Sequence, residues 1–185
     1  MLLGAGSDAQ IANHFSDLKH HLNDHPDVHL ELRFDHELAH LVYAGADLMV
    51  MPSMFEPCGL VQQVAVKYGT VPVVRAVGGV VDTVFDHQYS DAPPEQRNGF
   101  VFHHVDDAAL ESAMARAIEL WHGYPDQFRQ LMLNGMRTDR SWAHPGREYL
   151  NVYDYVRHKH AAARQPELDS GATARHDRLL SLIHI

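Results

Sequence analysis

Short runs of apolar residues alternate along the chain with stretches in which apolar residues recur at helical spacing. The opening Met-Leu-Leu run predicts a strand that leads into a glycine turn, and four further apolar runs predict strands over residues 29–34, 47–53, 71–76 and 99–104. The stretches between them predict helices over residues 9–24, 36–45 and 59–69. Strands and helices that alternate at this spacing are typical of βαβ units. We therefore expect an α/β fold, with a parallel sheet and helices on both faces.

After residue 105 the pattern becomes helical. A helix over residues 106–123 starts at an acidic cap and stops at Gly123. Its spacing predicts an inward face made of Leu110, Met114, Ala117, Ile118 and Trp121. Two further helices are predicted over residues 125–136 and 141–159.

From about residue 160 the pattern fades, and no sustained period follows. The last six residues, LSLIHI (180–185), are abrupt enough to suggest non-native sequence. We therefore expect a domain over residues 1–158 and an irregular tail over residues 159–185. The domain begins in the middle of a strand, which suggests a piece of a longer protein.

Composition narrows the classes of function. The chain of 185 residues is 45% hydrophobic and 21% charged, as in an ordinary soluble globular protein. Its formal net charge is −9, so we expect no nucleic-acid surface, which would need clustered Lys and Arg. No stretch reaches the roughly 18 apolar residues of a membrane span. Cys58 is the only cysteine, which excludes an intrachain disulfide and is compatible with a reducing compartment.

One short motif suggests a metal site. Residues 36–40 read HELAH, and in zinc proteases HExxH places two histidines one helical turn apart on the metal. The chain holds 16 scattered histidines, which makes an accidental match more frequent, and the HxxGxxH continuation with a third ligand is absent. We interpret the match as an accident in which His40 packs or hydrogen-bonds near the helix end. A metallopeptidase stays as an outside alternative.

The most informative segment is residues 52–79. A strand ends at Ser53, a loop carries Glu56, and a helix is expected to begin near Cys58 and Gly59. Ligands of open α/β sheets bind at the carboxyl ends of the strands, and a helix N-terminus favours an anion such as phosphate. A carboxylate beside it can accept hydrogen bonds from the vicinal hydroxyls of a sugar. Glu56 could equally be a capping carboxylate at the helix start.

Residues 52–84 read PSMFEPCGLVQQVAVKYGTVPVVRAVGGVVDTV. This segment closely resembles the glycogen synthases of bacteria and the starch synthases of plants that use ADP-glucose, whose pattern is approximately PSxFEPCGLTQ, a helix ending in YG, a strand, and GGLxDTV. The resemblance extends over about residues 1–158, through AHLVYAGAD, RNGFVF and YLNVYDYVRH, and is most like cyanobacterial enzymes. It implies a glycosyltransferase-B architecture, two Rossmann-like domains with the donor in the cleft. Residues 1–158 would then be a partial C-terminal, nucleotide-sugar-binding domain with its C-terminal helices.

The resemblance also implies roles for single residues. Glu56 would hold the donor glucose hydroxyls at the catalytic centre, the N–H groups of Gly59 and Leu60 would meet the distal phosphate, and Phe34 would lie against the adenine. For Phe34 a core aromatic at a strand end is the alternative, and a tight turn is the alternative for the glycine pair. The residues that would line the same loops are Ser53, Cys58, Gly78 and Gly79. A nucleophilic role for Cys58 needs a histidine base that no pattern identifies.

The implied reaction is transfer of glucose from ADP-glucose to the nonreducing end of an α-1,4-glucan, glycogen or starch, with retention. No metal or cofactor is expected, because side chains and the helix dipole replace a metal at the diphosphate. The implied location is the bacterial cytoplasm, or the plastid in a plant or alga.

Several departures from the family pattern matter. Val61 stands where the family usually has threonine, and Val80 where it usually has leucine. In the family, the Arg/Lys pair that grips the diphosphate and the lysine–glycine loop lie upstream of residue 1. The missing N-terminal domain is therefore an expected partner, and we expect little or no turnover by this chain alone. The alternatives are a related glycosyltransferase with another nucleotide-sugar donor, and a non-catalytic nucleotide-sugar-binding or glucan-binding module.

Overall fold

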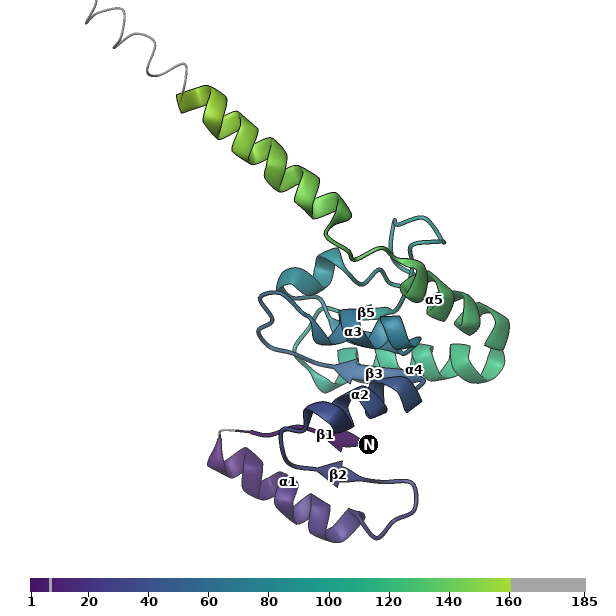
Figure 1. Ribbon diagram of the computed structural model, residues 1–185. Helices are drawn as coiled ribbons and strands as arrows, with labels where there is room; N and C mark the ends of the chain where they lie inside the picture. The colour runs from purple at the N-terminus through teal and green to yellow at the C-terminus, as the bar shows by residue number, and fades with distance from the viewer. Residues whose placement is uncertain (7, 161–185) are drawn as a thin grey trace, which may run out of the picture. The chain divides into compact units, whose positions relative to one another are not determined.

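The computed structural model describes residues 1–6 and 8–160, which fall into two compact units, one over Met1–Thr138 and one from Asp139 onward. In the first unit strands and helices alternate along the chain (Figure 1). The strands are β1 (Leu2–Leu3), β2 (Leu30–Glu31), β3 (Leu48–Met51), β4 (Val71–Arg75) and β5 (Phe100–Phe102). The α-helices are α1 (Ala9–Leu22), α2 (His36–Gly45), α3 (Val61–Tyr68), α4 (Asp107–Gly123) and α5 (Pro125–Arg137), and a 3-10 helix, η1, spans Gly78–Asp82.

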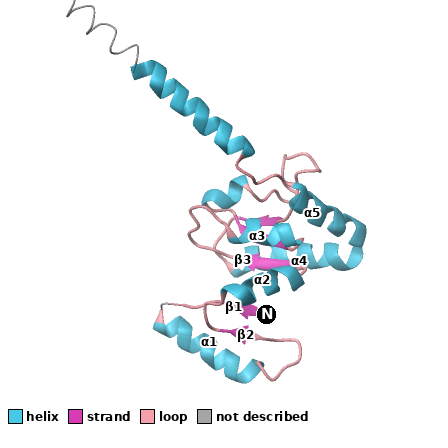
Figure 2. Cartoon of the chain, viewed as in Figure 1, coloured by secondary structure: helices cyan, strands magenta, loops and turns pink. Residues whose placement is uncertain are grey.

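Every strand pair in this unit is parallel, and the strands form two sheets (Figure 2). β1 pairs with β2, with Leu2 opposite Leu30. In the other sheet β4 lies between β3 and β5, so that Val73 is opposite both Val50 and Phe100. The predicted α/β class and the place of each predicted strand are confirmed. The difference is that β1 and β2 do not join the sheet of β3, β4 and β5.

The core lies on both faces of β4. Val71 and Val73 are 1% exposed and pack with Phe100, Ala117, Leu131 and other residues of α4 and α5. Val74, on the opposite face, is fully buried in a smaller cluster with Met51, Val80 and Val84. A strand buried on both faces is typical of the centre of a parallel sheet covered by helices on each side.

Two details of the helices differ from prediction. α3 begins at Val61 rather than near Cys58 and Gly59, because Gly59 has a left-handed φ of +68° that no α-helix accommodates. It ends at Gly69, as predicted, with φ of +94°. In α4 the predicted inward face is partly wrong, since Ile118 and Trp121 are 44% and 39% exposed.

The buried face of α4 is made of Ala113, Ala117 and Leu120. The small alanines let the helix backbone approach the sheet closely, so the helix turns that side inward and leaves two larger apolar residues at the rim. Leu110 and Met114 pack partly buried against the core, as expected.

In the second unit residues 143–160 are helical, which confirms the last predicted helix. Its aromatic residues form a row in which the ring of Tyr149 lies 5.8 Å from that of Trp142 and 6.4 Å from that of Tyr153. The predictions for residues 161–185 lie outside the described residues. Within the described part of the chain, no helix has the length and apolar character needed to cross a membrane.

Candidate functional site

The loop between β3 and α3 folds back on itself around the backbone of Gly59. The Gly59 N–H donates a hydrogen bond to Glu56 Oε1 at 3.0 Å, and Glu56 is half-buried. Glu56 therefore caps the turn that precedes α3, which is the alternative role predicted for it. This bond uses only part of the capacity of a carboxylate, whose two oxygens offer about four acceptor positions. The same side chain can accept hydroxyl hydrogen bonds while it holds the turn.

Gly78 and Gly79 lie directly against this loop. The Gly79 N–H donates to the Pro57 carbonyl at 3.2 Å. A β-carbon on Gly79 would come within 2.5 Å of the Cys58 carbonyl oxygen, and one on Gly78 would overlap the carbonyl of Glu56. The glycine pair is therefore needed for the close approach of two backbone segments, and a tight turn alone does not explain it.

Arg75 fixes the start of the loop from the end of β4. Its Nη1 donates to the carbonyls of Ser53 at 3.1 Å and Met54 at 3.0 Å, and its Nε donates to the His103 carbonyl at 3.3 Å. The sequence reasoning did not single out this residue. The sequence feature that could have indicated it is a charged residue, Arg75, at the end of the otherwise apolar strand β4.

Two adjacent glutamines hold the carbonyl side of Gly59. Gln62 is 1% exposed, and its Nε2 donates to the Gly59 carbonyl at 2.6 Å and to Thr83 Oγ1 at 3.0 Å. Gln63 Nε2 donates to the same carbonyl at 2.9 Å. Gln62 thus ties α3 to the residue that follows η1. Gln62 was also not predicted from the sequence. An amide side chain on the apolar face of a predicted helix does indicate a buried hydrogen bond to another element.

Of the remaining predicted site residues, Ser53 is half-buried and the other three are exposed. Phe34 is 84% exposed in the loop after β2, where its ring lies 5.8 Å from that of His36, so the core-aromatic alternative for Phe34 is wrong. Cys58 is exposed, and Leu60 is 68% exposed. All these loops follow the carboxyl ends of parallel strands, the edge at which open α/β sheets bind ligands.

The HELAH residues form a local cluster of rings. The rings of His36 and His40 stack 5.7 Å apart, and His40 Nδ1 lies 3.1 Å from the Tyr68 hydroxyl. The predicted packing and hydrogen bonding of His40 is confirmed. Within residues 1–6 and 8–160, no group of three or more His, Cys, Asp or Glu is placed to hold a metal ion.

A buried ion pair supports β5 away from this loop. Arg116 Nη1 donates to Asp86 Oδ1 at 3.0 Å, and Asp86 also accepts the backbone N–H groups of Val101, Gln88 and Tyr89. Burial by itself raises the pKa of Asp86. The hydrogen bonds from Arg116 and the three amides outweigh it, so the pKa lies below its usual range.

The structure thus gathers a carboxylate, a helix start and a glycine pair at the carboxyl ends of parallel strands, the edge at which α/β folds of this kind bind ligands. The family model for glycosyl transferases group 1 matches residues 6–131, and the chain belongs to this family. The predicted fold class is confirmed by this match and by the solved structure described next.

The relatives are named as glycogen and starch synthases. The chain is 59% identical over 160 residues to glycogen synthase 1 of Synechococcus sp. (strain JA-3-3Ab), covering 86% of this chain and 33% of that protein. It is 55% identical over 159 residues to glycogen synthase 2 of Methylococcus capsulatus, with the same coverage of each chain. The catalytic domain of starch synthase IV from Arabidopsis thaliana, solved with ADP and acarbose, superposes with a TM-score of 0.77 at 33% identity, covering 82% of this chain and 31% of that chain. The predicted resemblance is confirmed, and the chain spans about a third of the length of these relatives.

Proposed function

We propose that this chain is the nucleotide-sugar-binding part of a retaining glucosyltransferase. The enzyme transfers glucose from ADP-glucose to the nonreducing end of an α-1,4-glucan, glycogen or starch. The names of the relatives support the reaction, and the ADP in the solved relative supports an adenine nucleotide as the carrier. The rest of the enzyme, an N-terminal domain, is the partner that completes the active site, and the location is the cytoplasm.

The observation that carries the proposal is that Glu56 is fixed in two ways. Its side chain is bonded to Gly59, and its backbone packs against the pair Gly78 and Gly79. Glu56 Oε1 accepts a hydrogen bond from the Gly59 N–H at 3.0 Å. Gly78 packs against the carbonyl of Glu56, and Gly79 packs against the carbonyl of Cys58. A carboxylate with a fixed position and spare acceptor capacity is suited to orient the hydroxyls of a donor glucose. Its negative charge also stabilises positive charge that develops on the sugar ring in the transition state.

The phosphate side of the site is formed by the residues that lead into α3. The first turn of this helix has no side-chain cap, so its N–H groups and its dipole are directed at the position where an anion would bind. Leu60 and Gly59 are the residues proposed to meet the distal phosphate. Because the Gly59 N–H is bonded to Glu56, its part in phosphate binding requires that this N–H be shared between the carboxylate and a phosphate oxygen in a three-centre hydrogen bond.

Phe34 is proposed to bind the adenine of the donor. An exposed ring in a loop at the carboxyl end of a strand can stack on a nucleobase, and its exposure leaves a face for that contact. Ser53 and Cys58 line the same edge, where Arg75 holds the backbone of Ser53 in place.

The experiment is labelled-glucose transfer to glycogen by the full-length protein, with ADP-glucose or UDP-glucose as donor and EDTA present. We expect transfer that prefers ADP-glucose and is unchanged by EDTA. Glu56→Gln should lower kcat by about 100-fold, a magnitude typical for loss of a charge that acts in the transition state. Glu111→Gln, the same change at an exposed position of α4, is the matched control and should leave the rate unchanged.

Two outcomes distinguish the alternatives. Transfer that prefers UDP-glucose would assign the site to a related glycosyltransferase with another donor. A folded full-length protein that transfers from neither donor would contradict the proposal and favour a non-catalytic binding module. The chain of residues 1–185 alone is expected to show little or no turnover in the same assay.

A further inference from the structure

The ring cluster of the HELAH residues ends at the loop that carries Phe34. The rings of Phe34 and His36 lie 5.8 Å apart, and their planes are inclined at 53°. Phe34 is 84% exposed and His36 is exposed, so both rings leave surface open to solvent. Two aromatic rings therefore border one open surface where the loop after β2 enters α2.

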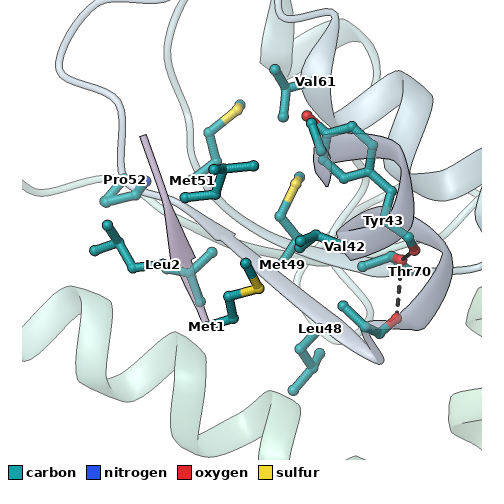
Figure 3. Close-up of a pocket in the computed structure, with 14 residues that line it drawn as sticks. Met1, Leu2, Val42, Tyr43, Leu48, Met49, Met51, Pro52, Val61 and Thr70 are labelled. Carbon is teal, nitrogen blue, oxygen red and sulfur yellow. Dashed lines mark hydrogen bonds between the residues drawn. The ribbon is translucent and has the colours of Figure 1, made fainter. Parts of the chain in front are cut away.

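This pair of rings rests on a fixed support. His36 stacks on His40 at 5.7 Å with the planes 25° apart, and His40 Nδ1 lies 3.1 Å from the Tyr68 hydroxyl of α3. The end of α2 is held as well, because the fully buried Thr70 donates from its hydroxyl to the Ala46 carbonyl at 3.0 Å (Figure 3). The helix is thus fixed at its middle and at its end, so His36 needs little further ordering to contact a ligand.

The imidazole of His36 has polar groups that the chain does not use. Among residues 1–6 and 8–160 its contacts are with the rings of Phe34 and His40, and neither of its nitrogens has a hydrogen-bond partner. A neutral imidazole offers one N–H donor and one acceptor nitrogen. Proteins that bind single bases stack them on aromatic side chains and form hydrogen bonds with their polar edges. Phe34 supplies a stacking surface, and His36 supplies the hydrogen-bonding groups beside it.

The angle between the two rings determines how a base can meet them. A base that stacks on Phe34 is parallel to that ring, so it is inclined at 53° to His36 and offers His36 an edge and not a face. A purine has two fused rings, so one can cover Phe34 while the other extends toward His36, whose centre lies 5.8 Å away. A pyrimidine has one ring, which stops short of His36 when it is centred on Phe34.

We propose that His36 is a specificity-determining residue for the donor: it contacts the polar edge of a purine base stacked on Phe34, and so favours ADP-glucose over UDP-glucose. The inference rests on the proposed function, in which Phe34 binds the adenine. It adds a residue to that site and gives the donor preference a physical cause. Phe34 stacks on either kind of base, since every base has an aromatic face, and His36 reaches only the larger one.

Calorimetric titration of the full-length protein with ADP and with UDP tests this role without any turnover. His36→Ala should weaken ADP binding by about 5-fold to 20-fold, the loss expected for one or two hydrogen bonds, and should leave UDP binding within about twofold. Phe34→Ala should weaken both nucleotides, because it removes the stacking surface. His14→Ala is the matched control: His14 is an exposed histidine whose ring lies 6.0 Å from that of Phe15, and neither affinity should change.

Two further measurements separate a base contact from other roles of His36. Inorganic pyrophosphate has no base, so its affinity, measured by displacement of ADP, should be the same for His36→Ala and for the parent. His40→Ala removes the ring beside His36 but leaves His36 itself, so it should weaken ADP binding less than His36→Ala does. The substituted side chains are exposed, so the melting temperatures of these variants should stay close to that of the parent.

Several outcomes would overturn the proposal while the proposed function stands. They are equal weakening of ADP and UDP by His36→Ala, no weakening of either, and equal weakening of ADP and pyrophosphate. A larger effect of His40→Ala than of His36→Ala would leave His36 as a packing residue. Tighter binding of UDP than of ADP by the parent would contradict the proposed donor together with the role of His36, and that result needs no variant.

Discussion

The α-carbon of Gly78 lies so close to the main chain of Glu56 that a β-carbon at residue 78 would overlap the Glu56 carbonyl. Glu56 lies in the loop after β3, and Gly78 is the first residue of η1, which follows the neighbouring parallel strand β4. The position of the proposed sugar-binding carboxylate therefore depends on a residue that offers no side chain. The backbone of Gly78 that supports Glu56 is therefore part of the site, as the carboxylate is.

Gly78→Ala should destabilise the protein and weaken donor binding. The substitution adds an overlap with the Glu56 backbone and places alanine at φ of +52°, and such left-handed strain costs about 1–3 kcal/mol. Urea unfolding measures the loss of stability. Gly123→Ala is the control, since a β-carbon at residue 123 meets nothing within 4 Å. Equal unfolding free energies for the two variants would contradict this prediction, because they would show that the backbone near residue 78 accommodates a β-carbon without cost.

Gln62→Leu should destabilise the protein by about 1–2 kcal/mol, because it removes a fully buried donor to Gly59 and Thr83 while it keeps most of the side-chain volume. Gln63→Leu is the matched control. It removes a hydrogen bond to the same Gly59 carbonyl, but from a half-buried position. We expect the larger loss of unfolding free energy and of donor affinity for Gln62→Leu, and the reverse order would contradict a tie through Thr83.

The Asp86–Arg116 pair should make stability depend on pH in the acid range. The folded-state pKa of Asp86 is lowered, so its contribution to stability is present above the unfolded pKa of about 3.9 and is lost as the pH falls through the folded value. Asp86→Asn should cost about 3 kcal/mol at neutral pH, because the largely buried Arg116 loses its charged partner.

Unfolding free energies of the parent protein and of Asp86→Asn, measured from neutral pH down to about pH 2.5, check this prediction. The gap between the two proteins should narrow as the pH falls below about 4. A gap that stays constant over the whole range would mean that the ionised carboxylate is not what stabilises the folded chain.

The hydrophobic pattern predicted the positions of helices and strands along the chain better than it predicted their packing and pairing. The helix over residues 36–45 has the predicted bounds, and the predicted stop at Gly69 is present, because local spacing and a terminating glycine determine both. The buried face of α4 was predicted less well, since Ala113 is selected by close approach to the sheet and not by hydrophobicity. The division of the strands into two sheets depends on long-range pairing, which local periodicity does not report.

The candidate site shows the same limit. Glu56 and Gly59 were identified from the local strand–loop–helix pattern and then, together with the glycine pair, from a resemblance in sequence; the structure brings these segments together. Arg75 and Gln62 were not identified, because their partners are distant in sequence: Arg75 donates to the carbonyls of Ser53 and Met54, and Gln62 donates to the Thr83 hydroxyl. Their partners become visible only when the loops are placed in three dimensions.

The central claim is that Glu56 binds the glucose of the donor in addition to capping the turn at Gly59. Titration calorimetry of the full-length protein with ADP-glucose and with ADP, for the parent and for Glu56→Gln, tests it directly. Glutamine keeps an oxygen that can accept the Gly59 N–H but loses the charge, so ADP affinity should stay within about twofold while ADP-glucose affinity falls by about 10-fold to 100-fold, the loss expected for charge-assisted hydrogen bonds. Equal weakening of both ligands, or no change in either, would contradict the claim and leave Glu56 as a capping residue alone.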